Sequence, residues 1–473
     1  MDIKTMKMQD VKTRVYDAIE KAKQLQPKLN AVVTFVDVEE QLEALKQIPS
    51  DAPLYGIPVV LKDNVNTKGI LTTASSRILS NYIPVYDAAI CEKLKANGAI
   101  IIAKASMDEL GMGGTNLSAY SGPVHNPYDT TRISGGSSGG SAVLCAAGVA
   151  PLTIGTDTGD SIRKPAAYNG VIGVKPTYGR ISRYGIIPYA SSLDHVGYFT
   201  TTVADAAAAL HVLAGRDDRD MTTGNEPVPA YESLINDDIH GKRIAVIDNI
   251  IEAVKEEAIV QSFESLLTKL EERGAVIEHV RLNDELLSVL LPTYFIIANA
   301  EATANHSNLD GIRFGVREAG ESVEEVMINS RTKGFSSNIR KRFVIGSYSL
   351  FVENQDKLFR KAQKVRRLIV NEVKAVLDQY DMILTTAAPT IAPHPEDSVD
   401  EALSDTYLIA ENHMIIGNFT GYPCMTMPCG FVSNMPIGIH MMAKPYCEQE
   451  LFNIGSAIEA ETGLKGITAE VKA

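Results

Sequence analysis

The fold of this chain is decided by residues 134–166, which read SGGSSGGSAVLCAAGVAPLTIGTDTGDSIRKPA. A run of glycine and serine leads into an alanine-rich segment over 138–149, whose pattern is typical of a helix with Ser138 available as its N-cap. A short apolar strand follows over 152–155, and a polar turn then carries Ser161. A helix and a strand in close succession indicate an α/β architecture.

The segments on either side continue the alternation of strands and helices. Apolar spacing predicts helices over 11–25, 88–96 and 252–272, and short apolar runs predict strands over 31–36, 57–61, 99–103, 243–247, 276–280, 382–385, 425–428 and 437–442. This alternation predicts a largely parallel or mixed sheet with helices on both faces. The continuity of the elements predicts a single domain over 1–473, with a mostly helical excursion at about 282–380.

Composition and charge are those of an ordinary globular protein. Of the 473 residues, 45% are hydrophobic and 22% charged, so the chain can bury a large core. Lysine and arginine number 45 against 58 aspartate and glutamate, which gives a net charge of −13. Because phosphate contacts depend on a surplus of lysine and arginine, the chain is a poor candidate for binding nucleic acid by itself.

The cysteines and the N-terminal segment indicate neither an oxidising compartment nor a membrane. The five cysteines lack CxxC spacing, which favours reduced thiols and argues against a metal site; they are Cys91, Cys145, Cys424, Cys429 and Cys447. Residues 1–21 lack the apolar run of a signal peptide, and the most apolar stretch, 142–155, is too short to cross a bilayer. We expect a cytoplasmic protein.

Lys62 ends the apolar run IPVVLK at 57–62. A lysine at the end of a strand is usually solvated. A buried lysine loses its proton more readily, because desolvation disfavours the ammonium, and it can then act as a base. The sequence at this position is compatible with both environments.

Two segments supply candidate serine nucleophiles. The run at 134–142 is typical of a flexible linker, of a phosphate-binding loop, or of a tight loop that places a serine hydroxyl in a site; the Lys-Ser/Thr ending of a P-loop is absent. The turn GTDTGDSIRKP at 155–165 offers Ser161 either as a helix N-cap or as a nucleophile beside an oxyanion hole. A serine nucleophile needs a base, and a neutral lysine can fill that role.

Taken together, these segments resemble the amidase signature family, whose fold is a large, mixed, twisted β-sheet covered by helices on both faces. The resemblance implies a catalytic triad of Lys62, Ser137 and Ser161, with Ser137 on an unusual cis peptide bond. The residues that it assigns to the oxyanion hole are Thr158, Gly159, Asp160 and Ser161, and those that support the triad are Ser138, Asp157 and Arg163.

Further motifs narrow the resemblance to one branch of that family. The motifs are VKPTYGRISRYG at 174–185, ASSLD at 190–194, DGIRFG at 310–315 and KAQKVR at 361–366. They are similar to the glutaminase subunits of amidotransferases that act on glutamyl-tRNA(Gln) and aspartyl-tRNA(Asn). The likeness, from about residue 29 to 464, implies a heterotrimer with two partners called the B and C subunits. In it the B subunit contacts most of the tRNA and uses ATP and Mg²⁺, while this chain needs no cofactor or metal.

The mechanism implied by the resemblance starts at Lys62. Neutral Lys62 takes a proton from Ser137, which takes one from Ser161, and Ser161 attacks the side-chain amide of glutamine. Ammonia leaves, water hydrolyses the glutamyl ester, and the ammonia travels to the B subunit. The acceptor is Glu-tRNA(Gln), Asp-tRNA(Asn) or both.

Free glutamine carries two charges besides the reacting amide. An arginine suits its α-carboxylate and an acidic residue suits its α-amine. By resemblance, Arg342 binds the carboxylate and Tyr294 lines the pocket, while Glu411 stands where the family has aspartate. The alternative for Arg342 is a solvated position on a helix face.

The turn around Ser161 departs from the family's GGSIRQ, because Asp160 replaces a glycine and Lys164 a glutamine. A carboxylate beside a developing oxyanion is unfavourable, and aspartate tolerates a positive φ less well than glycine. Our hypothesis is that Asp160 and Lys164 form an ion pair, so that the oxyanion amides still function.

Two other functions stay open beside the glutaminase subunit. One is a stand-alone amidase acting on small-molecule amides, with the same fold and triad but no partners. The other is a non-catalytic scaffold protein that Asp160 has disabled. The run KPTYGRISRYG favours the glutaminase subunit, and the three intact triad positions argue against the scaffold.

Overall fold

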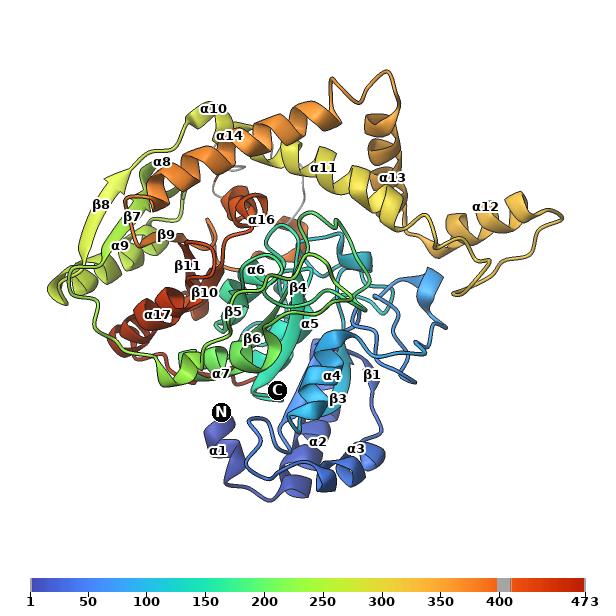
Figure 1. Cartoon of the computed structure of the whole chain (residues 1–473), viewed down its shortest axis with the longest axis horizontal. Coiled ribbons are helices and arrows are strands. Elements are labelled where there is room, and N and C mark those ends of the chain that lie inside the picture. The colour runs from blue at the N-terminus through green and yellow to red at the C-terminus, as the bar shows by residue number, and fades with distance from the viewer. Residues whose placement is uncertain (1, 398–408, 410, 472–473) are drawn as a thin grey trace.

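The computed structural model of the chain describes residues 2–397, 409 and 411–471. Eleven strands of these residues form one sheet (Figure 1). They are β1 (Val32–Phe35), β2 (Pro58–Lys62), β3 (Ile100–Ala105), β4 (Leu152–Asp157), β5 (Ile172–Lys175), β6 (His195–Thr200), β7 (Arg243–Ile247), β8 (Val276–Val280), β9 (Met382–Thr386), β10 (Cys424–Val432) and β11 (Met435–Ala443).

The strand order is β1-β3-β2-β4-β6-β5-β10-β11-β9-β7-β8. Strand β2 pairs in parallel with β3 and β4, and β7 pairs in parallel with β8 and β9. The strands between and beyond these groups pair antiparallel. The predicted mixed sheet is therefore confirmed.

Helices surround the sheet. They are α1 (Ile3–Lys7), α2 (Val11–Leu29), α3 (Glu39–Ala44), α4 (Ala89–Ala96), α5 (Gly139–Ala146), α6 (Arg163–Asn169), α7 (Val203–Leu213), α8 (Asp248–Ile251), α9 (Glu257–Glu272), α10 (Asp284–Ser288), α11 (Leu290–Asn305), α12 (Val323–Gly334), α13 (Ser337–Leu350), α14 (Phe359–Leu377), α16 (Ile416–Thr420) and α17 (Glu448–Thr462). In the part of the chain that the structure describes, no helix has both the length and the apolar character needed to span a membrane.

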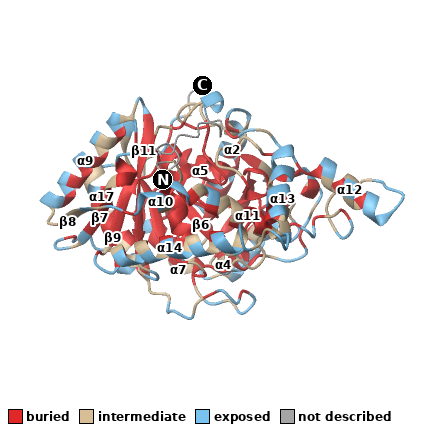
Figure 2. Ribbon diagram, turned by 90° about the horizontal axis from the view of Figure 1, so that it is seen from above, coloured by how far each residue is buried: buried red, intermediate tan, exposed pale blue. Residues whose placement is uncertain are grey.

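Both faces of the sheet are covered, as the alternation of side chains along single strands shows. In β2, Val59 and Leu61 belong to a core with residues of α4, α7, α9 and α17, whereas Val60 packs among residues of α2 and α5. In β7, Ile244 lies in the first of these cores and Ala245 packs with residues of α11 and α14. Buried residues follow the strands, while the outer faces of α9, α13 and α14 are exposed (Figure 2). Helices on both faces are thus confirmed.

Most predicted elements are present, although several differ in their bounds. The helix predicted over 252–272 begins at Glu257, because 248–251 form the separate helix α8. Ser138 stands at the N-cap position of α5, but its hydroxyl makes no capping hydrogen bond. The strand predicted over 425–428 extends over Cys424–Val432. The five helices α10 to α14 occupy much of the predicted excursion, and α12 extends away from the sheet (Figure 1). The single-domain organisation stays a prediction.

Candidate active site

Lys62 is the last residue of β2, and its side chain is fully buried. Its Nζ lies 2.8 Å from Ser137 Oγ and 2.8 Å from Ser138 Oγ. It also lies 3.0 Å from Thr156 Oγ1 and 3.3 Å from the Thr156 carbonyl oxygen. The predicted strand-end lysine is therefore enclosed by polar atoms inside the protein and is not solvated.

The burial of Lys62 changes its acidity. Desolvation lowers the pKa of Lys62 to about 7, although Asp108, Asp157 and Asp194 act in the opposite direction. Near neutral pH, a large fraction of this amine is therefore uncharged. An uncharged amine in contact with a serine hydroxyl can accept its proton.

The glycine- and serine-rich run forms a buried loop that leads into α5. The Gly136–Ser137 peptide bond is cis. The next residue, Ser138, donates from Oγ to the Thr156 carbonyl oxygen at 2.9 Å. A Cβ at Gly140 would lie only 2.5 Å from the Ser106 carbonyl oxygen, so glycine permits the close approach of this loop to the sheet. The loop is a tightly packed support for Ser137 rather than a flexible linker.

The second serine loop follows β4. Ser161 is buried, and its carbonyl oxygen accepts a hydrogen bond from the Ser138 N–H at 3.1 Å, which ties the two serine loops together. Ile162, not Ser161, stands at the N-cap position of α6. Asp160 is not among the non-glycine residues with positive φ, so replacing glycine there brings no such strain.

A buried ion pair holds this turn. Arg163 donates to both carboxylate oxygens of Asp157, at 3.1 and 2.9 Å. Asn418 joins the pair, since its Oδ1 accepts from Arg163 at 2.6 Å and its Nδ2 donates to Asp157 Oδ1 at 2.9 Å. Burial alone would raise the pKa of Asp157, but the Arg163 guanidinium lowers it well below its usual range.

Further hydrogen bonds orient the residues before Ser161. Thr158 donates from Oγ1 to Asp194 Oδ1 at 2.7 Å. Arg163 donates to the Gly159 carbonyl oxygen at 2.7 Å. Since the C=O and N–H of a trans peptide point in opposite directions, this contact directs the N–H of Asp160 away from Arg163. The turn thus has the fixed backbone that an oxyanion hole requires.

Two residues of the helical region, Tyr294 and Arg342, lie near each other, and Tyr294 contacts the same turn. A Cβ at Gly159 would lie 3.1 Å from the Tyr294 hydroxyl, so the ring of this α11 residue packs on the turn. Arg342 on α13 is half-buried and donates to the Tyr189 hydroxyl at 3.2 Å. Burial raises the pKa of Tyr294, and Tyr189 raises it further. Tyr294 therefore lies beside the turn that carries Ser161, and the charge of Arg342 acts on Tyr294.

Lys164 forms the predicted ion pair with Asp160, with Nζ 3.0 Å from Asp160 Oδ2. It also contacts the Glu411 carboxylate and donates to the Glu411 carbonyl oxygen at 2.7 Å. The Lys164–Glu411 contact was not predicted from the sequence. Asp160, Lys164 and Glu411 therefore form one charged group, which we call the Lys164 cluster.

Comparison with known proteins shows the family of the chain. The model of a family described as Amidase matches residues 14–452. The chain belongs to the amidase family. The A subunit of glutamyl-tRNA(Gln) amidotransferase from Pediococcus pentosaceus is 43% identical over 423 residues, covering 88% of this chain and 85% of that protein. A protein of the same name from Sulfurihydrogenibium is 37% identical over 450 residues, covering 92% and 90%.

Solved structures of amidase-family proteins have the same fold. The crystal structure of the A subunit of glutamyl-tRNA(Gln) amidotransferase from Thermotoga maritima has a TM-score of 0.84 at 35% identity, covering 100% of this chain and 98% of that one. Native peptide amidase from Stenotrophomonas maltophilia has a TM-score of 0.82 at 26% identity, covering 98% and 96%. The two TM-scores are nearly the same, whereas the sequence identity to the amidotransferase subunit is higher than that to the peptide amidase.

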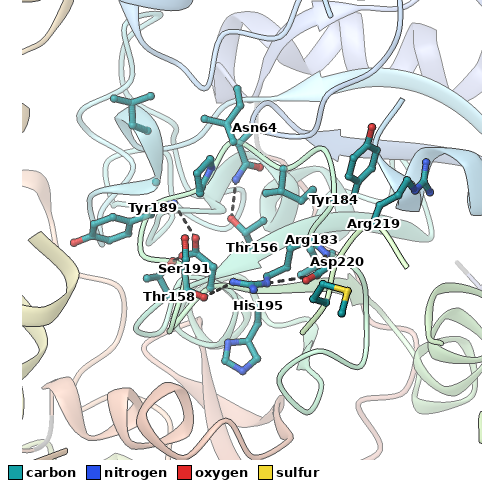
Figure 3. Close-up of a pocket in the computed structure, with 18 residues that line it drawn as sticks. Asn64, Thr156, Thr158, Arg183, Tyr184, Tyr189, Ser191, His195, Arg219 and Asp220 are labelled. Atoms are coloured by element: carbon teal, nitrogen blue, oxygen red, sulfur yellow. Dashed lines mark hydrogen bonds and ion pairs between the residues drawn. The ribbon is translucent and has the colours of Figure 1, made fainter. Parts of the chain in front are cut away.

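Beside the triad positions, this amidase-family chain has a cavity of about 250 Å³. It begins at Asn64, Thr156 and Thr158 and extends toward Arg183 and Asp220 (Figure 3). The Asn64 amide points to the Thr156 hydroxyl and donates to it at 3.0 Å (Figure 3). The cavity therefore adjoins the residues that surround Lys62.

Several residues of this amidase site were not singled out from the sequence. Asn64 stands two residues after Lys62, and Thr156 stands inside the quoted turn at 155–165, so their place in the sequence could have suggested them. No comparable signal marks Tyr189 or Asn418, which reach the site only through the fold. Among the described residues, no group of three or more histidine, cysteine, aspartate and glutamate side chains is placed to hold a metal ion.

Proposed function

We propose that this chain hydrolyses the side-chain amide of glutamine and supplies the ammonia to an amidotransferase that acts on charged tRNA. The observation that carries the chemistry is the contact of the buried Lys62 amine with the Ser137 hydroxyl at 2.8 Å. The substrate follows from the relatives named as A subunits of glutamyl-tRNA(Gln) amidotransferase, which are 35–43% identical.

Proton transfer begins at Lys62. In its neutral form the amine accepts the Ser137 proton, while its remaining N–H groups donate to Ser138 Oγ and to Thr156. Ser137 in turn accepts the proton of Ser161, whose oxygen attacks the amide carbon. The proton returns along the same path to the leaving ammonia, and a water molecule then hydrolyses the ester.

The turn before Ser161 stabilises the developing negative charge. Backbone N–H groups from Thr158 to Ser161 face the tetrahedral intermediate, and the Asp157–Arg163 pair keeps the turn rigid. Lys164 compensates the carboxylate of Asp160 at 3.0 Å, so that no uncompensated anion lies next to the oxyanion. Ser138 supports the relay through its contacts with Lys62 and Thr156.

The substrate lies between the turn and the helical region. Arg342 binds the α-carboxylate of glutamine, Tyr294 forms the wall over Gly159, and Glu411 faces the α-amine. The cavity beside Thr158 offers ammonia a way out of the site. The B and C subunits complete a cytoplasmic heterotrimer, in which the B subunit binds most of the tRNA and uses ATP and Mg²⁺. A net charge of −13 fits a chain that leaves tRNA binding to its partners.

The test is ammonia release from glutamine by the purified chain with its two partner subunits, ATP, Mg²⁺ and charged tRNA. We expect release that depends on the partners and is abolished in Ser161→Ala, since this variant lacks the attacking oxygen. Release that persists in the variant would contradict the assigned nucleophile. Hydrolysis of small amides but not of glutamine, with or without partners, would favour the stand-alone amidase.

A further inference from the structure

The Lys164 cluster places a permanent cation where the substrate amine is expected. The Lys164 side chain is 5% exposed, and those of Asp160 and Glu411 are 17% and 22% exposed. Burial would lower the pKa of Lys164, but the two carboxylates outweigh it and raise the pKa well above its ordinary value. The ammonium therefore stays charged at every pH at which the enzyme works.

The cluster also adjoins the turn that carries Ser161. Asp160 directly precedes Ser161, and its charge acts on Tyr294, whose ring packs on Gly159. Lys164 lies one helical turn further on, in α6. Its Nζ is bound on one side by Asp160 and on the other by the carboxylate and carbonyl of Glu411. A substrate ammonium that approaches Glu411 thus meets a carboxylate that already has a cationic partner.

We propose that Lys164 is a specificity-determining residue that reduces the preference of the site for amides carrying an α-ammonium. The proposal rests on the proposed function and deepens it. Lys164 already binds the Glu411 carboxylate that a substrate ammonium would approach, as well as Asp160. The substrate amine gains less from this cluster than it would from a carboxylate without a resident cation. Free glutamine is consequently favoured only weakly over an amide of the same length that lacks the amine.

The probe is glutaramate, which has the reacting amide and the carboxylate of glutamine but no α-amine. The ratio of kcat/KM for glutamine to kcat/KM for glutaramate isolates the contribution of the amine. Because both substrates need the same folded site and the same nucleophile, turnover of glutaramate also reports whether a variant is correctly folded. All measurements use the complex with its partner subunits.

The informative variant is Asp160→Asn/Lys164→Gln, which removes one charge of each sign and takes the Lys164 ammonium away from Glu411. We expect the ratio to rise about tenfold, mainly through a lower KM for glutamine. Asp160→Asn alone removes one of the two carboxylates that compensate Lys164, so its ammonium repels the substrate amine more strongly and we expect the ratio to fall several-fold. Lys374→Gln is the matched control, since it removes a lysine from an exposed pair with Asp378 and should leave the ratio unchanged.

An unchanged ratio in both Asp160 variants would overturn the proposal, as would equal changes for the two substrates. These results differ from a failure of the proposed function. If the wild-type complex hydrolyses neither substrate in a Ser161-dependent way, the proposed function itself is wrong. If it hydrolyses both and the ratio does not respond to the double variant, only the role of Lys164 is wrong.

Discussion

At the scale of single residues, Lys62 has its reactivity from its position at the end of a buried strand. Its Nζ is enclosed by the hydroxyls of Ser137, Ser138 and Thr156, none of which carries a charge to stabilise the ammonium. Desolvation therefore prevails over the more distant carboxylates. The lysine is a base because the fold removes water from it.

This predicts a pH dependence of glutamine hydrolysis. Since the active form of Lys62 is neutral and its pKa is about 7, kcat/KM should rise as the pH passes upward through this value and level off above it. Lys62→Arg should lower kcat by about 10²–10⁴-fold, because arginine keeps its proton. Initial rates of ammonia release between pH 5.5 and 9 measure both effects. A flat profile across neutral pH would rule out Lys62 as the base.

The Asp157–Arg163 pair predicts a stability effect. Asp157→Asn leaves the fully buried guanidinium without its counter-charge, and we expect a loss of about 3–5 kcal/mol in the free energy of unfolding. The folded-state pKa of Asp157 lies below its unfolded value of about 3.9. Its stabilisation is thus fully present above about pH 4 and is lost as the pH falls further.

Urea unfolding followed by circular dichroism at pH 5 and pH 7 should show the same deficit for Asp157→Asn at both values. Asp378→Asn, in an exposed pair with Lys374, is the control and should change the midpoint little. Equal midpoints for wild type and Asp157→Asn would mean that the pair does not hold the turn.

At the scale of elements, the sequence of a short segment predicted most of the strands. Strands over 243–247 and 276–280 were predicted to the residue, because they stand on either side of the segment predicted as a helix, in the strand–helix–strand alternation. Strands β5 and β6 were not predicted, since glycine, lysine and histidine interrupt their apolar pattern. In β6, Gly197 allows the close packing of β5, because a Cβ at this position would collide with the Val174 carbonyl oxygen.

The approach of α5 to the sheet predicts the effect of one methyl group. In Gly140→Ala the new Cβ would lie 2.5 Å from the Ser106 carbonyl oxygen and 2.7 Å from that of Ala31, both in rigid backbone. Moving α5 displaces Ser137, so we expect a loss of about 1–3 kcal/mol in stability and of about 10²-fold in kcat.

Thermal unfolding and ammonia release measure these two losses. Gly430→Ala is the matched control, because its Cβ would lie 3.7 Å from the Ile437 side chain, an ordinary van der Waals distance. If both alanine variants behaved alike, the close approach of α5 would not be what positions Ser137.

At the scale of the whole molecule, the site joins residues that are far apart in the sequence. Sequence motifs pointed to Lys62, Ser137 and Ser161, because each lies in a short distinctive segment. The contact of Lys164 with Glu411 spans 247 positions and that of Tyr189 with Arg342 spans 153. No local pattern encodes such contacts, because they arise only when segments distant in the sequence pack together in the fold. That is why Glu411 was predicted as a substrate residue without its resident partner.

The strand order further predicts how the molecule unfolds. The group β1 to β6 and the pair β7 and β8 are joined through β10, β11 and β9, which come from the last quarter of the chain. Neither side of the sheet is complete without these strands, so the single-domain proposal predicts one cooperative transition. With 18 tyrosines and no tryptophan, near-ultraviolet circular dichroism of tyrosine can be compared with the far-ultraviolet signal.

Two cavity-forming variants, one near each edge of the sheet, make this test specific. Ile101→Ala in β3 and Ile244→Ala in β7 each remove a fully buried side chain, which should cost about 2–5 kcal/mol. In a single domain, either variant shifts the whole transition in urea, in both spectral regions, by the same amount. If each variant instead shifted only one part of a two-step transition, the two sides of the sheet would be separate folding units, and the C-terminal strands would join two domains.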